Sequence, residues 1–408
     1  MIKVHKIRLE PSEAQKQYFQ QACNASRKAY NWACGKWKEA YKLRNEAYKA
    51  GIKSEDLPNL PSESELRKQF NSIKKQEFSW VLEVTKCAVQ QGIIDFGVAV
   101  KNMFDDKKKG RRVRMPDFKR KGKSKETFYF DNAHKAELCV NKSLKVPLLG
   151  KVKMSEKLRF EGRILSVRIS KKSDKWFASV SIETEDEIVI PPVGGIIGID
   201  LGIKVFATLS NGESFIGPKA NKAKEARIKR YQRSLSRKQN GSKNRTKAKT
   251  KLSRLHEQVA NIRNDYIHKF THKIASTYDT VVIEDLKVSK MMKSRFAKMI
   301  ADQAWGETRR QLTYKIERRG GRLIVADQFF ASSQICSCCG YRQAMPLNIR
   351  IFSCGGCGLV IDRDLNAAIN LKNLAVRSTV SVCGAVASDS SLRKNQAVVL
   401  KQKINTAS

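Results

Sequence analysis

The chain of 408 residues is long enough for roughly two to four domains, and its 80 lysines and arginines against 39 acidic residues give a formal net charge of +41. This surplus predicts a polyanionic partner, and nucleic acid is favoured over a membrane because no segment approaches the roughly 18 consecutive apolar residues of a span. The N-terminus lacks a signal-peptide core and most cysteines are dispersed, so we expect a cytoplasmic protein without a disulfide framework.

The first part of the chain combines one short strand with a helical unit. Residues 2–9 alternate apolar and basic side chains, which is typical of a strand. Ser12 followed by Gln15 is a capping-box pattern and predicts the start of a long amphipathic helix. A second helix is expected after Ser62, with Glu65 completing its capping box, and a third from about residue 81 to 104.

A basic connector and a β-rich module follow. Residues 105–125 form a glycine-punctuated basic run, in which we expect Lys119, Arg120 and Lys121 to face phosphates. Residues 126–185 contain short runs of alternating apolar and polar side chains, separated by turn residues, which predicts several strands. Because the first strand would otherwise have no partner, we expect residues 2–9 to pair into this sheet, so that the helical unit is an insertion.

Three acidic residues recur at the ends of apolar strands or at a helix start. Asp200 follows the apolar run 196–199, Glu284 follows 280–283, and Asp364 begins a helix. Alternating strands and helices can gather such distant residues at one edge of an α/β sheet. Gathered carboxylates normally hold cations, and hard oxygen ligands prefer Mg²⁺ or Mn²⁺. Acids at strand ends are also common helix caps, so this pattern alone leaves both interpretations open.

A strongly basic stretch lies between the first two acids. Residues 219–254 hold fifteen lysines and arginines against the single acid Glu225, and their apolar spacing predicts two helices around the break at 239–242. A charge run can be only a solvated face, but the net charge of the chain favours contact with a phosphate backbone. The candidate contacts are Lys229, Arg230, Arg233, Arg237 and Lys238.

Four cysteines have the spacing of a zinc site. Cys336, Cys339, Cys354 and Cys357 form two C-x2-C knuckles separated by fourteen residues, just below the usual spacing for a four-cysteine zinc site. An apolar link at 349–352 supports a hairpin between the knuckles, as in a zinc ribbon. Cys338 is a further thiol within the first knuckle, and a register that uses it in place of Cys339 is the alternative.

The sequences GIDLGIKVFATLS, VVIEDLKVSKM and CSCCG with CGGCGLVIDRDLNAAINL resemble the nuclease segments and zinc ribbon of the TnpB family, from about residue 194 to 374. They resemble compact type V CRISPR effectors less closely. The resemblance implies a multidomain α+β protein. Its parts would be a β-barrel wedge (1–10 and 116–190) with an inserted helical recognition lobe (11–115), an RNase H-like, RuvC-type α/β nuclease domain (191–332 and 358–375), and a zinc ribbon that binds target nucleic acid (333–357). Residues 376–408 are rich in Ser, Ala and Val without a sustained period, which predicts a flexible tail that is dispensable for catalysis.

The resemblance also implies a function. A TnpB protein binds a guide RNA from the transposon end, one protein per RNA, and cuts double-stranded DNA that pairs with this RNA next to a short motif. Asp200, Glu284 and Asp364 match the family's Mg²⁺ (or Mn²⁺) ligands, and Asp285 and Asp362 are interpreted as capping or outer acids. The alternatives are a type V CRISPR effector, a DNA-binding repressor on the same scaffold, and an accessory transposase.

Overall fold

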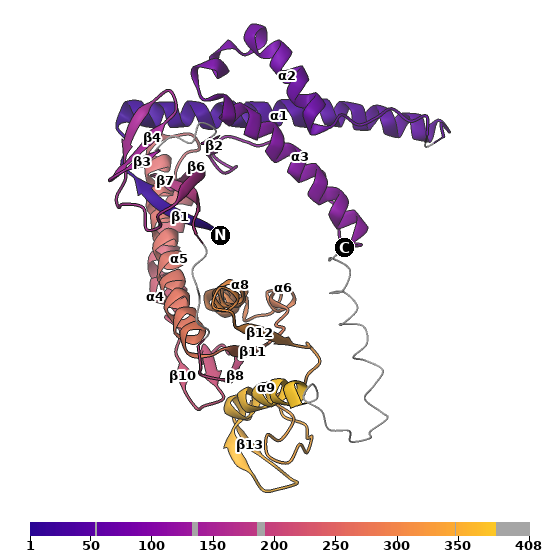
Figure 1. Cartoon of the computed structure of the whole chain (residues 1–408), viewed down its shortest axis with the longest axis vertical. Coiled ribbons are helices and arrows are strands. Elements are labelled where there is room, and N and C mark those ends of the chain that lie inside the picture. The colour runs from indigo at the N-terminus through magenta and orange to yellow at the C-terminus, as the bar shows by residue number, and fades with distance from the viewer. Residues whose placement is uncertain (54, 133–137, 186–191, 347, 381–408) are drawn as a thin grey trace. The chain divides into compact units, whose positions relative to one another are not determined.

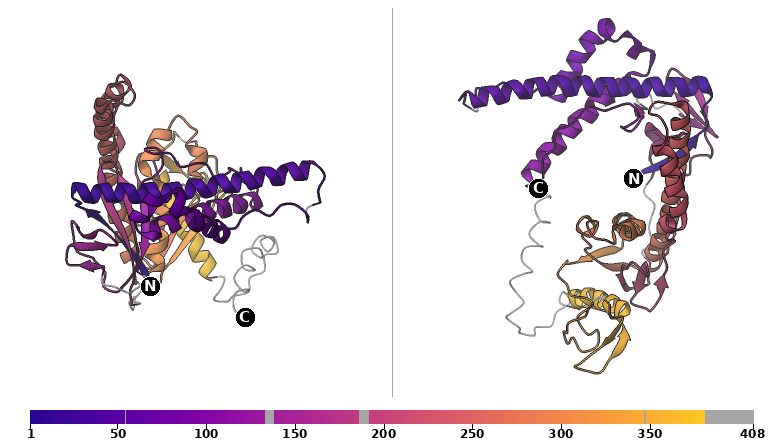
Figure 2. Two further views of the ribbon diagram at one scale, coloured as in Figure 1. Left: turned by 90° about the horizontal axis from the view of Figure 1, so that it is seen from above. Right: turned by 180° about the vertical axis from the view of Figure 1, so that it is seen from behind.

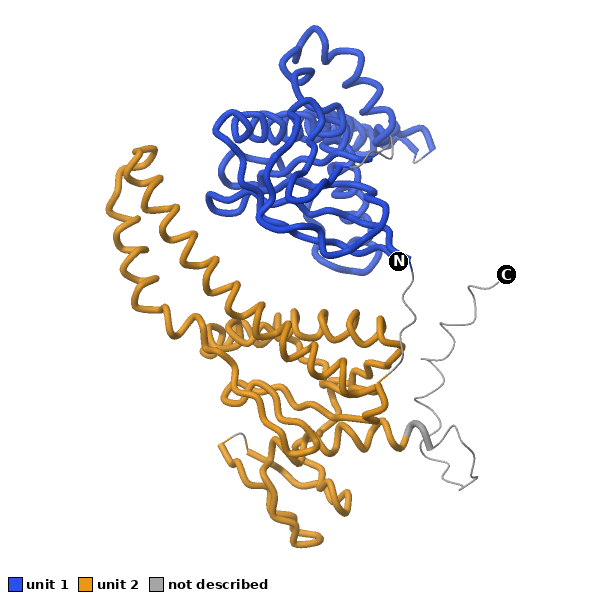
Figure 3. The backbone as a smooth tube through the Cα atoms, turned by 60° about the vertical axis from the view of Figure 1, so that its left-hand side comes forward, with its two compact units in different colours: residues 1–187 blue, residues 188–408 orange. Residues whose placement is uncertain are grey.

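The computed structural model describes residues 1–53, 55–132, 138–185, 192–346 and 348–380. The chain divides into two compact units, Met1–Glu187 and Ile188–Ser408 (Figure 3). Among the described residues, no helix is long and apolar enough to cross a membrane. The expected tail falls mostly on residues 381–408, which lie outside the described residues, whereas 376–380 continue the last helix.

Two antiparallel sheets form the β part of unit 1, one with the order β1-β7-β6-β2 and one with β3-β4-β5. Their bounds are β1 Ile2–Leu9, β2 Thr127–Asp131, β3 Cys139–Val140, β4 Ser143–Val146, β5 Gly150–Lys153, β6 Arg163–Lys172 and β7 Lys175–Glu183. β1 pairs along its whole length with β7, which confirms that the N-terminal strand belongs to the later β module. The described strands form these two open sheets, joined by a bridge between Leu9 and Met154, in place of one closed barrel.

The helices of unit 1 are inserted between β1 and β2 (Figure 1). They are α1 Glu13–Lys49, α2 Glu63–Glu77, the 3-10 helix Ser79–Glu83 and α3 Lys86–Lys108. The capping boxes of Ser12 with Gln15 and of Ser62 with Glu65 are both present, as predicted. The third helix begins at Lys86, later than expected, because Val84 adopts an extended conformation and is buried in the core.

One hydrophobic core joins the helices and sheets of unit 1. Phe19 of α1 packs against Trp176 of β7 with ring centroids 5.1 Å apart. α3 lies close against α1 because Gly92 has no side chain, and a Cβ there would come within 2.3 Å of the Ser26 carbonyl oxygen. The basic connector is fixed to α1 by reciprocal hydrogen bonds between the Asn31 side chain and the Lys119 backbone, at 2.8 and 2.9 Å.

Unit 2 is built on a mixed sheet with the order β10-β9-β8-β11-β12. The strands are β8 Ile196–Asp200, β9 Ala207–Leu209, β10 Ser214–Phe215, β11 Thr280–Glu284 and β12 Arg322–Ala326. β8, β11 and β12 are parallel, and β9 is antiparallel to both of its neighbours. The central strands β8 and β11 therefore end at the same edge.

The helices of unit 2 are α4 Ala220–Ser236, α5 Lys243–Thr277, α6 Val288–Met291, α7 Ala297–Gln303, α8 Trp305–Glu317 and α9 Arg363–Val380. The basic stretch forms the hairpin of α4 and α5, which lie side by side in both views of Figure 2. Apolar residues at helical spacing predict one helix from about 301 to 318, but the positive φ of 51° at Ala304 separates α7 from α8. α5 and α8 cover one face of the sheet, and α9 covers the other.

Candidate functional site

Two of the predicted acids lie at the ends of neighbouring strands. Ile199 of β8 is opposite Ile283 of β11, so Asp200 and Glu284 follow at the ends of parallel strands that lie about 4.8 Å apart. Ile199 and Ile283 pack on the face covered by α5 and α8. Because side chains alternate along a strand, Asp200 and Glu284 point to the opposite face, which α9 covers.

The third acid reaches this face on α9. Gly198 lets α9 lie directly against β8, since a Cβ at this position would come within 2.0 Å of the Ala368 carbonyl oxygen. Asp364 is in the first turn of α9. Burial, together with the negative charges of Glu284 and Asp364, raises the pKa of Asp200 to about 8. The fold therefore brings all three predicted acids within electrostatic reach of one another.

Polar and basic side chains that the sequence analysis missed contact these acids. Burial raises the pKa of Glu284, and the hydroxyl of Ser332, which donates a hydrogen bond to its carboxylate, counteracts part of that rise. Arg350 and Arg363 lie 3.4 and 3.3 Å from the two carboxylate oxygens of Asp364. Arg363 was adjacent to a predicted site residue, but no sequence pattern marked Ser332 or Arg350.

The two neighbouring acids have local partners. The Asp362 Oδ1 atom accepts hydrogen bonds from the backbone amides of Asp364 and Leu365, at 2.9 and 3.0 Å, so it caps the N-terminus of α9. Asp285 is paired with Arg309 at 2.5 Å. Both arrangements favour the interpretation of these residues as capping or outer acids.

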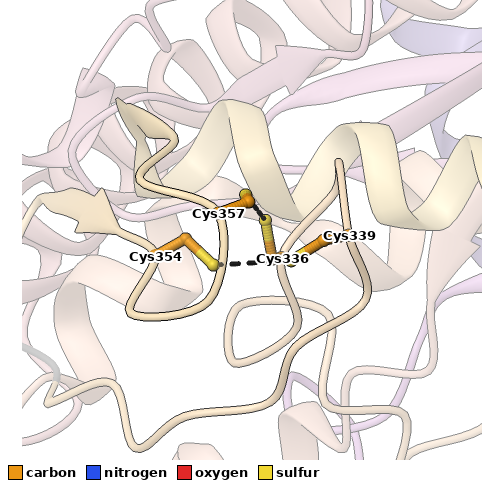
Figure 4. A group of neighbouring side chains, drawn as sticks. All are labelled: Cys336, Cys339, Cys354 and Cys357. Carbon is orange, nitrogen blue, oxygen red and sulfur yellow. Dashed lines mark hydrogen bonds between the residues drawn. The ribbon is translucent and has the colours of Figure 1, made fainter.

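The cysteines form a cage that fits zinc. The four sulfur atoms of Cys336, Cys339, Cys354 and Cys357 lie within 4.8 Å of one another (Figure 4). Two sulfur pairs are 3.7 and 3.6 Å apart, close to the roughly 3.8 Å expected around a tetrahedral ion with zinc–sulfur bonds of about 2.3 Å. The Cys357 and Gly356 amides, together with the Cys336 and Cys339 thiols, lower the pKa of Cys354 to about 6, which favours a thiolate. Cys338 is exposed and outside the group, which favours the predicted register.

The ribbon is attached to the helix that carries Asp364. Its hairpin pairs β13 (Ile351–Ser353) with β14 (Val360–Asp362), directly before α9. The buried Asn366 of α9 donates to the Ile335 carbonyl oxygen and accepts from the Ser337 amide, at 2.8 and 2.9 Å. Asn370, one turn later, donates to the Ser332 carbonyl oxygen at 2.8 Å. These asparagines position both the first knuckle and Ser332, and their spacing of four in DLNAAIN was the signal for them in the sequence.

The carboxylates are less closely gathered than the thiols. Within the described part of the chain, only the four cysteines form a group of three or more metal-binding side chains with all ligand atoms within 4.8 Å. Asp364 is held by its two arginines, and Asp200 and Glu284 are half-buried side chains with raised pKa values. Carboxylates offer hard oxygen donors, and negative charges that lie close together favour a bound cation. These acids therefore fit a site for divalent cations.

The predicted nucleic-acid contacts fall into two groups. Arg230, Arg233, Arg237 and Lys238 line one groove of about 370 Å³ along α4, together with Ser234. Lys229 lies outside this groove, and its ammonium group is 3.0 Å from Glu225.

The three predicted contacts in the connector, Lys119, Arg120 and Lys121, also differ in how accessible they are. The Lys119 ammonium lies 3.8 Å from the centre of the Tyr30 ring and 3.7 Å from Asp95, and burial lowers its pKa. Arg120 and Lys121 are exposed. The grooved face of α4 and these two connector residues are therefore the predicted contacts most accessible to phosphates.

Three protein families match successive parts of the chain. The "Probable transposase" family of IS605 OrfB proteins matches residues 179–295, the "Cas12f1-like, TNB domain" family matches 305–371, and a "Helix-turn-helix domain" family matches 1–53. The matched residues 1–53 fold as β1 and the single long helix α1.

Relatives and one solved structure extend over most of the chain. "Putative RNA-guided DNA endonuclease" of Streptomyces pristinaespiralis is 35% identical over 319 residues, 76% of each chain. "Putative RNA-guided DNA endonuclease InsQ" of Escherichia coli K12 is 30% identical over 400 residues, 94% of each chain. A Cas12f1–sgRNA–target DNA complex has a similar fold, with a TM-score of 0.51, 16% identity, and coverage of 89% of this chain and 83% of the effector. This similarity confirms the mixed α+β class.

Proposed function

Since the chain belongs to the TnpB family, we propose that it is an RNA-guided DNA endonuclease that hydrolyses phosphodiester bonds of double-stranded DNA. The observation that carries this proposal is the approach of three acids from separate elements to one face of a sheet, which holds Asp200 with a pKa of about 8. Nothing in the packing of a purely structural domain requires a buried cluster of like charges, because such a cluster destabilises the folded state.

The acids are proposed to hold two Mg²⁺ or Mn²⁺ ions in an RNase H-like domain formed by residues 191–332 and 358–375. When bound, such ions lower the pKa of water and stabilise the leaving oxygen of an in-line displacement. The half-buried carboxylates of Asp200 and Glu284 would hold these ions, and the Ser332 hydroxyl, which donates a hydrogen bond to Glu284, would orient it. Arg350 and Arg363 pair with Asp364 and would orient its carboxylate.

The remaining parts are proposed to bind nucleic acid and zinc. The ribbon of residues 333–357 holds one Zn²⁺ through its four thiolates, with a structural role, because no open coordination position remains. A guide RNA from the transposon end lies along the basic face of α4 and the connector, and the helical lobe 11–115 and the wedge 1–10 and 116–190 support it. The contacts go mainly to phosphates, which provide affinity without reading sequence.

The alternative functions have less support. A DNA-binding repressor on this scaffold has no need of the acids, and Asp200, Glu284 and Asp364 are all present. A type V CRISPR effector would share the fold and the chemistry but would take its RNA from a repeat array. An accessory transposase needs a separate means of joining DNA ends, and no motif for this was found.

One experiment separates these functions. The protein is purified from cells that carry its flanking DNA, the retained RNA is sequenced, and the complex is incubated with Mg²⁺ and plasmids that match or do not match this RNA. We expect an RNA from the transposon end and cleavage of the matched plasmid alone. Retention of no RNA, or cleavage independent of the match, would contradict the proposal.

A further inference from the structure

The segment of residues 286–301, which includes α6 and α7, begins directly beside the acids. It starts two residues after Glu284, where β11 ends. Its far end is fixed by Gln303, whose side-chain amide donates to the Ile203 carbonyl oxygen at 2.9 Å, three residues after Asp200. Both ends of the segment are therefore attached at the sheet edge where the two acids lie.

The inner side of this segment is firmly packed. Leu286, Val288, Met291 and Ile300 contact the core beneath α5 and α8. Arg263 of α5 donates to the Ala301 carbonyl oxygen at 2.7 Å. The turn between the two short helices is held by Ser294, whose hydroxyl donates to the Met291 carbonyl oxygen at 2.8 Å. The segment is thus an ordered surface beside α8 (Figure 1).

The outer side of the segment combines apolar and basic side chains. Met292, Phe296 and Met299 are 40%, 43% and 49% exposed. Residues 286–301 contain five lysines and arginines and no acid. Arg295 lies 4.9 Å from the centre of the Phe296 ring. The cations complement the phosphates of a polyanion, and the aromatic and thioether groups complement flat apolar faces on the same partner.

A single DNA strand has this chemistry, whereas a duplex hides the faces of its bases. We propose that Phe296, flanked by Met292 and Met299, stacks on a base of the displaced single strand and holds that strand at the edge that carries Asp200 and Glu284. The inference rests on the proposed function, because a displaced strand exists only where an RNA has paired with the other strand. Stacking on an aromatic side chain requires no particular base, which suits an enzyme whose RNA determines the sequence.

The first test is photochemical. The RNA-loaded protein, made inactive by Asp200→Ala, binds a matched duplex in which 5-iododeoxyuridine replaces thymidine in either the displaced or the paired strand. Irradiation should crosslink the displaced strand to the peptide that contains Phe296. A bound duplex that crosslinks elsewhere, or a protein partner that covers this surface while DNA does not contact it, overturns the inference.

Three variants test whether stacking matters. In single-turnover cleavage, F296L should be slower by at least about fivefold, the loss expected for one base–aromatic stack, while RNA retention stays unchanged. F296W keeps a ring and should recover most of the rate. Ile262→Ala removes a side chain of similar exposure, 40%, on α5 and should have no effect.

The outcomes separate the inference from its premise. Unchanged cleavage by F296L, or equal losses in F296L and F296W, overturns the role of Phe296 and leaves the endonuclease proposal intact. If the unaltered protein with its RNA fails to cut matched DNA, the proposed function itself is wrong.

Discussion

The two candidate metal centres of unit 2 differ in how the chain assembles them. The four cysteines come from one short hairpin, and their sulfur atoms already lie at the spacing of a zinc site. The three acids come from β8, β11 and α9, and Asp364 is turned to Arg350 and Arg363. Thiols from one hairpin are close together in the sequence and in space, whereas like-charged carboxylates from three separate elements repel one another, so the acidic centre depends more on the tertiary fold.

The largest expected effect tests the acidic centre. Asp200→Ala should lower the cleavage rate by at least about a thousandfold, roughly 4 kcal/mol of transition-state stabilisation, because the variant loses a proposed metal ligand. RNA and target binding should remain, since the phosphate contacts lie elsewhere. Cleavage assays and gel-shift measurements on the same preparation check both expectations.

Two comparisons sharpen this prediction. Asp285→Ala, which removes only the carboxylate paired with Arg309, should keep most of the activity. Double variants that combine Asp200→Ala with Glu284→Ala should be no worse than the single ones, because each already dismantles the shared site. Magnesium-dependent cleavage at the normal rate by Asp200→Ala would rule out the assignment.

The second prediction tests the thiol centre. Cys354→Ser should release zinc and expose the ribbon to protease, because a small ribbon has little core apart from its metal. Cys338→Ser should keep its full zinc content, since the Cys338 thiol is exposed and outside the cage. Zinc analysis of both proteins by mass spectrometry makes the comparison, and loss of zinc from Cys338→Ser would favour the alternative register.

The difference between a local motif and a site assembled from distant elements also explains which features could be predicted from the sequence. The cysteine cage and the capping boxes are local patterns, and the structure has each of them where its spacing predicts it. The acids could be recognised at the ends of apolar strands. The close approach of α9 depends on Gly198, however, and the pairing of Arg350 with Asp364 depends on how the ribbon packs. The break at Ala304 also escaped prediction, because an alanine with positive φ leaves no signal in the sequence.

The third prediction follows from the raised pKa of Asp200, about 8, which burial causes first and neighbouring acids second. The folded state binds this proton more tightly than the unfolded chain, in which the pKa is about 3.9. The contribution to stability is therefore complete below about pH 4 and is lost as the pH rises to about 8. In EDTA the melting temperature should fall as the pH rises through this range. Mg²⁺ should stabilise the protein more at about pH 8.5 than at about pH 6, because Asp200 is then ionised.

Thermal unfolding of the RNA-free protein measures this effect. Asp200→Asn cannot ionise and should show a weaker dependence on both pH and Mg²⁺. Equal stabilisation by Mg²⁺ at both pH values would show that the buried acids do not bind the cation.

The fourth prediction concerns the basic face of α4. Reversal of Arg230, Arg233 and Arg237 to Glu should weaken RNA binding and reduce the slope of log affinity against log salt by at least about 2, because about three phosphate contacts are lost. Lys229→Glu should change the slope little, since Lys229 is paired with Glu225 and lies outside the groove. Titrations at several salt concentrations test this, and a Lys229→Glu effect of about one third of the triple variant's would mean that only the change in net charge matters.

The smallest expected effect distinguishes a cap from a ligand. Asp362 accepts two backbone hydrogen bonds at the start of α9, so Asp362→Ala should destabilise this helix by about 1 kcal/mol and reduce cleavage only partly, through a less ordered Asp364. Asp362→Asn can still accept these bonds and should restore both stability and rate, because asparagine is an equally good N-cap. A direct metal ligand would respond differently, since an amide lacks the charge that a divalent cation requires. Cleavage by Asp362→Asn that is as low as that of Asp200→Ala would therefore place Asp362 among the ligands.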